Sequence, residues 1–153
     1  MRKKTLIVAF VGALAAGAIA GGATLALAQA DVIKQRQDNR KAAAAAMREI
    51  KGVIDAKGDA KTVVAQAAKL KELEVAFDKM FPKGSDQGAK TAALPEIWTD
   101  PAGFAAAGKA ADVAYDKLAV AAGSGDLAAV GAAFAETGKA CGACHTKYRA
   151  KQQ

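Results

Sequence analysis

The sequence predicts an all-α protein that folds as an antiparallel up-down four-helix bundle. Apolar residues recur at three- and four-residue spacing in four segments of about 20 residues each, which is the period of an amphipathic helix. Only 3 of the 153 residues are proline, and two of the three connections between the segments are short, as in bundles of antiparallel neighbours. A β-sandwich would need short alternating runs rich in aromatic and β-branched residues, and aromatic residues make up only 5% of this chain.

The N-terminal residues have the composition of an export signal. Basic residues occupy positions 2–4, an uncharged apolar run follows, and the run ends in small residues. We predict that residues 1–30 are a signal peptide, cleaved after Ala28 or Ala30, and that residues 31–153 form one mature domain. A retained membrane anchor is the alternative, because an apolar stretch of about 20 residues can cross a bilayer. The many Gly and Ala residues insert weakly and favour cleavage.

Charge and localisation follow from that signal. The predicted signal peptide contains 3 of the 22 basic residues and none of the 15 acidic ones. After its removal the mature domain has 19 basic and 15 acidic residues and a formal charge of +4. These charges are scattered, without the dense Lys/Arg block of a nucleic-acid-binding protein. We therefore predict no nucleic-acid partner and, for an exported chain, a periplasmic location in an oxidising compartment.

Gly58 and Asp59 separate the first two helices, because the first residue breaks a helix and the second can cap one. We place the first helix from Asp31, as its cap, to about Ile54. The second runs from about Ala60 to Phe81. Their apolar faces contain Val32, Ile33, Ala43, Met47, Ile50 and Ile54 in the first helix, and Val63, Ala67, Leu70, Leu73, Phe77 and Met80 in the second.

A loop from Pro82 to Asp100 comes next, and a loop of this length in a small domain is usually functional. The third helix starts at Asp100-Pro101, a cap followed by proline at the first position, and runs to about Ala122. A Gly-Ser-Gly turn leads into the fourth, from about Asp126 to Ala150. Their apolar faces contain Phe104, Ala107, Ala111, Tyr115, Leu118 and Ala122 in the third helix, and Leu127, Val130, Phe134, Cys141, Cys144 and Tyr148 in the fourth.

The fourth helix contains Cys141-Gly142-Ala143-Cys144-His145, the attachment pattern of a c-type haem. On a helix the two cysteines share one side, where their thiols can reach the two vinyl groups of one haem, and the histidine shares that face. We predict one covalently bound haem c, with Cys141 and Cys144 in thioether bonds and His145 as the axial ligand of the iron. The Ala-rich faces bury little area, so the bundle would gain from a large apolar group at its centre.

Other uses of this motif fit less well. A structural zinc site needs four ligands, and the chain offers two Cys and a single His. A thioredoxin-like dithiol belongs in a βαβ context. A disulfide between residues three apart in a helix is strained and gives His145 no role.

The sixth iron position is the next question, because many c-type cytochromes fill it with a Met sulfur. The mature chain contains only Met47 and Met80. Bundle topology puts His145 at the level of residues 36–41, two turns or about 10 Å from Met47. Met80 lies at the same end of the bundle as His145, although core packing is its commoner role. We expect an open sixth position, with these Met residues and Lys41 as the other ligands to consider.

The mature sequence resembles the cytochrome c′ family, the class II c-type cytochromes. The resemblance lies in the Cys141–Arg149 segment, in the Arg36-Gln37 pair and in the Leu94–Trp98 segment. It implies a periplasmic four-helix bundle with one covalent haem. Further haem contacts are implied for Arg36, Gln37, Thr91, Trp98, Tyr148 and Arg149. The alternatives to these haem contacts are a solvated surface position for Arg36 and ordinary core packing for Trp98.

One position departs from the family pattern. The residue one turn after Arg36 supplies the distal group, which is apolar in five-coordinate members and Met in a low-spin branch. Here it is Arg40, so this residue does not support the low-spin branch, and the pocket is less apolar than usual. Arg40 either turns outward or donates a hydrogen bond to a bound ligand or water.

Two functions remain. The first is a haem c electron carrier that serves unidentified periplasmic redox partners. The alternative is a gas-binding protein that takes a small ligand such as NO or CO at an open sixth site. We expect no enzyme, because no paired carboxylates or second His stand out as an acid and a base. Some family members form homodimers, and the resemblance extends that assembly to this chain.

Overall fold

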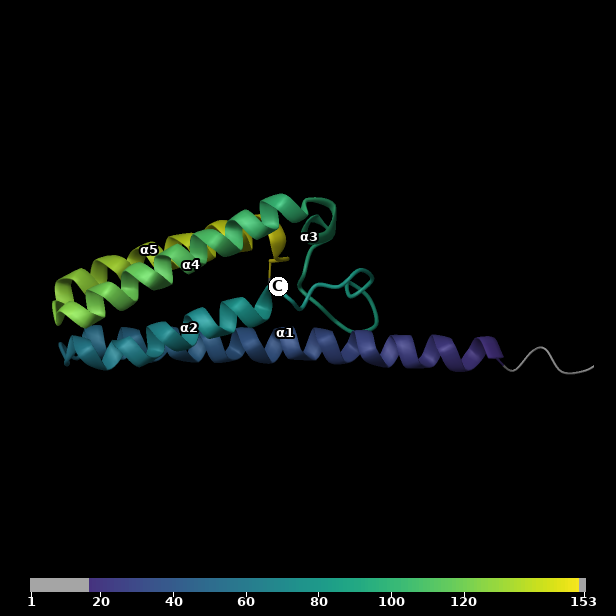
Figure 1. Cartoon of the computed structure of the whole chain (residues 1–153), viewed down its shortest axis with the longest axis horizontal. Coiled ribbons are helices and arrows are strands. Elements are labelled where there is room, and N and C mark those ends of the chain that lie inside the picture. Colours follow the sequence, from purple (N-terminus) through teal and green to yellow (C-terminus); the bar gives the residue numbers. More distant parts are fainter. Residues whose placement is uncertain (1–16, 152–153) are drawn as a thin grey trace, which may run out of the picture.

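Residues 17–151 are described by the computed structural model, and side chains from residue 28 onward; positions 2–4 of the predicted signal lie outside this range. Four long helices follow one another in antiparallel order (Figure 1). Two short elements, η1 (Ala60–Thr62) and α3 (Glu96–Thr99), lie in the connections. The long helices are α1 (Gly17–Asp55), α2 (Val63–Phe77), α4 (Pro101–Ser124) and α5 (Leu127–Tyr148). The predicted all-α four-helix bundle is confirmed.

The predicted start of the first helix is wrong. Helix α1 begins at Gly17 and passes without a break through Asp31, so Asp31 is not its cap. The residues before Asp31 are mostly Ala and Leu, which favour helix, and nothing in them stops it. In Figure 1 this N-terminal part of α1 extends past the other helices. No helix in the described part of the chain is long and apolar enough to cross a membrane.

Helix α2 is shorter than expected, ending at Phe77 instead of Phe81. The backbone N–H groups of Lys79 and Met80 bond carbonyls only three residues back, which tightens the chain into a turn. Pro82 explains this, because a residue before proline is disfavoured in the α conformation. The predicted loop that follows also contains the short helix α3.

The predicted cap at Asp100 is confirmed, and Asp126, predicted as the start of the fourth helix, is the cap of α5. The Asp100 side chain accepts from the Gly103 N–H at 3.0 Å, and Asp126 accepts from two N–H groups at the start of α5. Between the helices Gly125 has φ of 80°, a left-handed conformation that glycine adopts without strain. This turn fixes α5 antiparallel to α4 and so directs its C-terminal motif toward the other end of the bundle.

The buried residues match the predicted faces and add polar positions to them. All four long helices contribute to the core, which is rich in Ala; its largest fully buried apolar members are Ile33, Ile50, Leu70, Leu118, Val63 and Val130. The buried polar and charged residues are Arg36, Asn39, Glu74, Ser85 and Thr137. Apart from Thr137, these polar residues come from α1, α2 and the loop after α2.

Candidate functional site

The C-terminal turns of α5 carry Cys141, Cys144 and His145. The two cysteines are three residues apart, so they share one side of the helix, and both are half-buried free thiols. His145 is the next residue and is exposed. In Figure 1 this end of α5 lies beside the loop that contains α3, close to the C-terminus.

Burial raises the pKa of both thiols, Cys141 and Cys144, and the nearby Glu74 carboxylate raises both further. The thiols are therefore protonated and uncharged at neutral pH. A hydrogen bond with the Tyr115 hydroxyl acts in the opposite direction on Cys141. Tyr115 itself is a buried residue of α4. Its place on the apolar face of α4 was predicted, but not its contact with the thiol.

His145 has a lowered pKa, first because of burial and then because of the positive charges of Arg149 and Arg40. The imidazole is therefore neutral at pH 7 and keeps the nitrogen lone pair that binds a metal. Within residues 17–151, no group of three or more His, Cys, Asp or Glu side chains could hold a metal ion.

Arg36 is buried, so the surface alternative for this residue is wrong. Only 5% of it is exposed, and its guanidinium lies over the rings of Phe81 and Trp98, 4.8 and 5.6 Å from their centroids. One terminal nitrogen donates to the Ser85 carbonyl. Among the described residues, its Nε and Nη1 atoms are buried without a hydrogen-bond partner. A buried guanidinium with two unused N–H donors can bind a carboxylate through two parallel hydrogen bonds.

Aromatic rings join Arg36 to the end of α5. Phe81 packs edge to face against Trp98 and Phe104, at 5.9 and 4.8 Å between centroids, and Phe104 packs in the same way against Tyr148. The Trp98 indole N–H donates to the Pro82 carbonyl at 3.1 Å. The structure therefore brings Arg36, Trp98 and Tyr148 into one aromatic cluster at this end of the bundle.

The loop before α4 closes over this group. The Leu94 N–H donates to the Tyr148 carbonyl at 3.1 Å, and the Ala150 N–H donates to the Ala92 carbonyl at 2.9 Å. These two backbone hydrogen bonds hold the loop against the end of α5, next to the aromatic cluster.

The other residues implied by the resemblance have other contacts. Gln37 is exposed, and its amide donates to the Lys90 carbonyl at 2.9 Å. Thr91 accepts from the Ala93 N–H within the loop. Arg149 is exposed at the end of α5, where its charge acts on His145. The structure brings only Arg149 of these three to the motif.

Arg40 turns inward and pairs with Glu74, at 2.8 Å between Nη1 and Oε2. Sequence reasoning missed Glu74, although it follows the buried positions Val63, Ala67 and Leu70 at helical spacing. Burial and nearby carboxylates raise the pKa of Glu74 and also of Asp78, and Asp112 of α4 is one of the neighbours of both. The expectation of no paired carboxylates therefore needs correction: the fold groups three of them beside Arg40.

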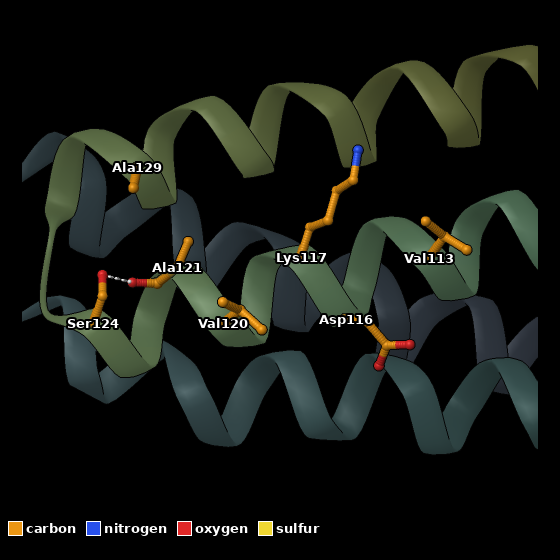
Figure 2. A pocket seen from close by; sticks show the side chains of 7 residues that line it. All are labelled: Val113, Asp116, Lys117, Val120, Ala121, Ser124 and Ala129. Carbon is orange, nitrogen blue, oxygen red and sulfur yellow. Dashed lines mark hydrogen bonds between the residues drawn. The ribbon is translucent and has the colours of Figure 1, made fainter.

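One surface groove lies away from the motif and another lies beside it. The larger, of about 550 Å³, lies on the outside of the α4–α5 hairpin and contains none of the motif residues (Figure 2). The smaller, of about 270 Å³, lies beside His145 and is lined also by Thr146, Arg149, Ala150 and Lys151. The chemistry-bearing end of α5 is thus reachable from the surface.

The comparison with known families decides the assignment. The model described as Cytochrome C' matches residues 31–149. The chain belongs to the cytochrome c′ family. Cytochrome c′ of Rubrivivax gelatinosus is 39% identical over 127 residues, which cover 79% of this chain and 95% of that protein. Cytochrome c′ of Rhodopseudomonas palustris is 33% identical over 144 residues, covering 90% and 94%.

Solved cytochrome c′ structures share the fold. The crystal structure from Rubrivivax gelatinosus superposes with a TM-score of 0.72 at 35% identity, covering 79% of this chain and 96% of that one. A nitric oxide complex of a mutant cytochrome c prime from Alcaligenes xylosoxidans gives a TM-score of 0.73 at 32% identity, covering 81% and 97%. Cytochromes c′ carry covalently attached haem c. The free thiols, the neutral imidazole and the open donors of Arg36 fit that group.

Proposed function

We propose that this cytochrome c′ is a periplasmic mono-haem protein that transfers single electrons. The observation that carries the proposal is the set formed by Cys141, Cys144 and His145 on the partly exposed end of α5. Cys141 and Cys144 would hold the haem through thioether bonds, and His145 would be the axial ligand. The iron supplies a one-electron couple when the haem is bound.

The surrounding residues would position this group and tune it. Arg36 would bind a haem propionate through its open nitrogens, while Phe81 and Trp98 keep water away from the guanidinium. A buried positive charge beside the haem disfavours the ferric state, because oxidation adds a positive charge there. The fold itself therefore supplies one means of setting the reduction potential.

The groove beside His145 favours electron exchange with another protein. Its rim includes Arg149 and Lys151, and the mature domain has a net positive charge. Complementary charge speeds the encounter of two proteins. We infer a periplasmic redox partner with an acidic surface at its docking site. No residue is assigned a catalytic role.

Gas binding is the second candidate. Met47 packs against the hydrophobic core, and Met80 lies in the turn after α2, so neither is committed to the iron by its contacts. Solved relatives include nitric oxide complexes. These observations support an open sixth position that takes a small gas. One relative is described as undergoing ligand-controlled dimer dissociation, and we extend a homodimer to this chain as part of the same proposal.

Optical spectra of the matured holoprotein test both candidates. We expect a ferrous high-spin spectrum that shifts on adding carbon monoxide, because the contacts of Met47 and Met80 commit neither of them to the iron. A low-spin spectrum that carbon monoxide leaves unchanged would contradict gas binding and leave electron transfer alone. No haem absorbance, from cells able to mature c-type cytochromes, would contradict both.

The N-terminus of the exported protein tests the signal. Cleavage after Ala28 leaves Gln29 as the first residue, and cleavage after Ala30 leaves Asp31. Mass spectrometry of the periplasmic fraction should find one of these two termini. Helix α1 of the mature protein would then start at the new N-terminus. A membrane-bound protein that begins at Met1 would establish the anchor instead.

A further inference from the structure

Ser85 is a buried residue in the loop after α2, where the neighbouring residues reach the surface. It is 1% exposed, whereas Lys83 and Gln87 on either side are exposed. A local turn places it there, because the Ser85 N–H donates to the Pro82 carbonyl at 3.1 Å and Gly84 between them has φ of 84°. A positive φ at this position belongs to a type II turn. The backbone thus carries a polar side chain away from water.

This turn is attached to the aromatic cluster beside the end of α5. The Pro82 carbonyl also accepts from the Trp98 indole N–H at 3.1 Å. Phe81, the residue before the turn, packs edge to face against Trp98 and Phe104, and the same cluster extends to α5. Direct contacts therefore place Ser85 at the end of the bundle that carries the haem motif.

Ser85 and Arg36 are in contact, and both have buried polar atoms without a partner. The Ser85 carbonyl accepts from one terminal nitrogen of Arg36. Among the described residues, the Ser85 hydroxyl oxygen and the Arg36 Nε and Nη1 atoms have no hydrogen-bond partner. Leaving such a group unsatisfied costs free energy, and most buried polar groups of native proteins have a partner. Three unsatisfied atoms on two residues in contact indicate a shared acceptor.

The chemistry of these atoms favours a carboxylate as that acceptor. The Arg36 nitrogens can only donate, and the Ser85 hydroxyl has one proton to donate. A carboxylate has two oxygens with about four acceptor positions, and its charge compensates the buried charge of Arg36. A water molecule accepts only two hydrogen bonds and leaves that charge uncompensated. Within the chain, Asp86 is the carboxylate whose charge acts on Arg36, so it is the acceptor to test against.

We propose that Ser85 is a haem-binding residue, and that its hydroxyl donates to the same propionate as the Arg36 guanidinium. The carboxylate would then satisfy all three atoms at once. This inference rests on the proposed haem site and deepens it, because it makes the loop after α2 part of that site. The type II turn, Trp98 and Arg36 would hold the hydroxyl in place before the propionate arrives.

The proposal fixes the sign of one deletion. If the hydroxyl has no partner in the holoprotein, Ser85→Ala removes a buried unsatisfied group and makes the holoprotein more stable. If the hydroxyl donates to the propionate, the same substitution removes a hydrogen bond to a charged group and makes the holoprotein less stable. The backbone carbonyl that accepts from Arg36 is kept in either case, so the variant tests the hydroxyl alone.

The test combines denaturant titration of the Ser85→Ala holoprotein with its resonance Raman spectrum. We expect the unfolding equilibrium constant to rise by about tenfold or more, the scale of one hydrogen bond to a charged group. The bending band of the haem propionates should shift, because its frequency depends on hydrogen bonds to the carboxylate. Ser124→Ala is the matched control, because it replaces the only other serine of the chain, at an exposed position at the far end of α4. It should leave this band unchanged.

An unchanged propionate band, or a Ser85→Ala holoprotein that is more stable than wild type, would overturn the inference. Asp86→Asn tests the acceptor within the loop. If it reproduces the loss of stability while Ser85→Ala leaves the band in place, the hydroxyl donates to Asp86 and the inference is wrong. The haem content of each denatured variant, measured as the pyridine adduct, reports separately on covalent attachment. A wild-type protein without haem would overturn the haem site itself, whereas attached haem with an unchanged band overturns only the role of Ser85.

Discussion

Alanine in place of His145 should remove the protein ligand of the iron while both thioether bonds remain. The thiols of Cys141 and Cys144 and the imidazole of His145 are separate groups on α5, so losing the imidazole does not remove the attachment points. His145 is the only histidine in the chain, so no other imidazole can replace it. We expect complete loss of the native ferrous spectrum, with haem still attached after denaturation.

Added imidazole provides the decisive control for this prediction. A small ligand can enter where the side chain is missing, and the groove beside His145 opens to solvent. Millimolar imidazole should therefore restore a His-ligated spectrum in the His145→Ala variant. Thr146→Ala, at the adjacent exposed position, should behave as wild type. A native spectrum in His145→Ala without imidazole would show that another residue is the axial ligand.

Local sequence signals predicted most of the fold. Helical periodicity identified the buried faces, and Asp100, Asp126 and the Gly-Ser-Gly turn marked the α4–α5 hairpin because caps and left-handed glycines act within a few residues. The prediction of where α1 starts was wrong for a physical reason. A signal peptide boundary is set by a protease, whereas helix formation depends on propensity, and the residues on both sides of the boundary favour helix.

The site was predicted less completely. The motif on α5 is contiguous in sequence, so its three residues could be identified together. The burial of Arg36 depends on Phe81, Trp98 and Ser85, which are at least 45 residues away in the chain and meet it only through the fold. No local rule links those segments.

The sequence did contain a signal for the Arg40–Glu74 pair, namely polar and charged residues at buried positions of their helices, but a search for apolar periodicity does not register it. Asn39 and Arg36 occupy the buried spacing of Ile33 and Ala43, and Glu74 continues the buried spacing of its own helix. A charged residue at a core position of one helix needs a partner on another. Such positions were therefore better evidence of a site than the apolar ones.

Replacing Arg36 by Met should destabilise the holoprotein and lower its reduction potential. Met fills a similar space beside Phe81 and Trp98 but cannot pair with a buried propionate or with the Ser85 carbonyl. Removing one member of a buried ion pair costs about 3–5 kcal/mol of unfolding free energy. Loss of the positive charge also stabilises the ferric haem, so reduction becomes less favourable. Denaturant titration followed by haem absorbance measures the first effect, and a redox titration measures the second.

Two further variants separate charge from packing in this prediction. Arg48→Met makes the same change of charge at an exposed position of α1, and solvent screening should leave both the stability and the potential close to wild type. Arg36→Lys keeps the charge but loses the planar fork that binds a carboxylate through two nitrogens. It should therefore retain most of the potential and lose part of the stability. If the reduction potential of Arg36→Met equals that of wild type, Arg36 does not face the haem. A buried charge close to the iron would change the potential.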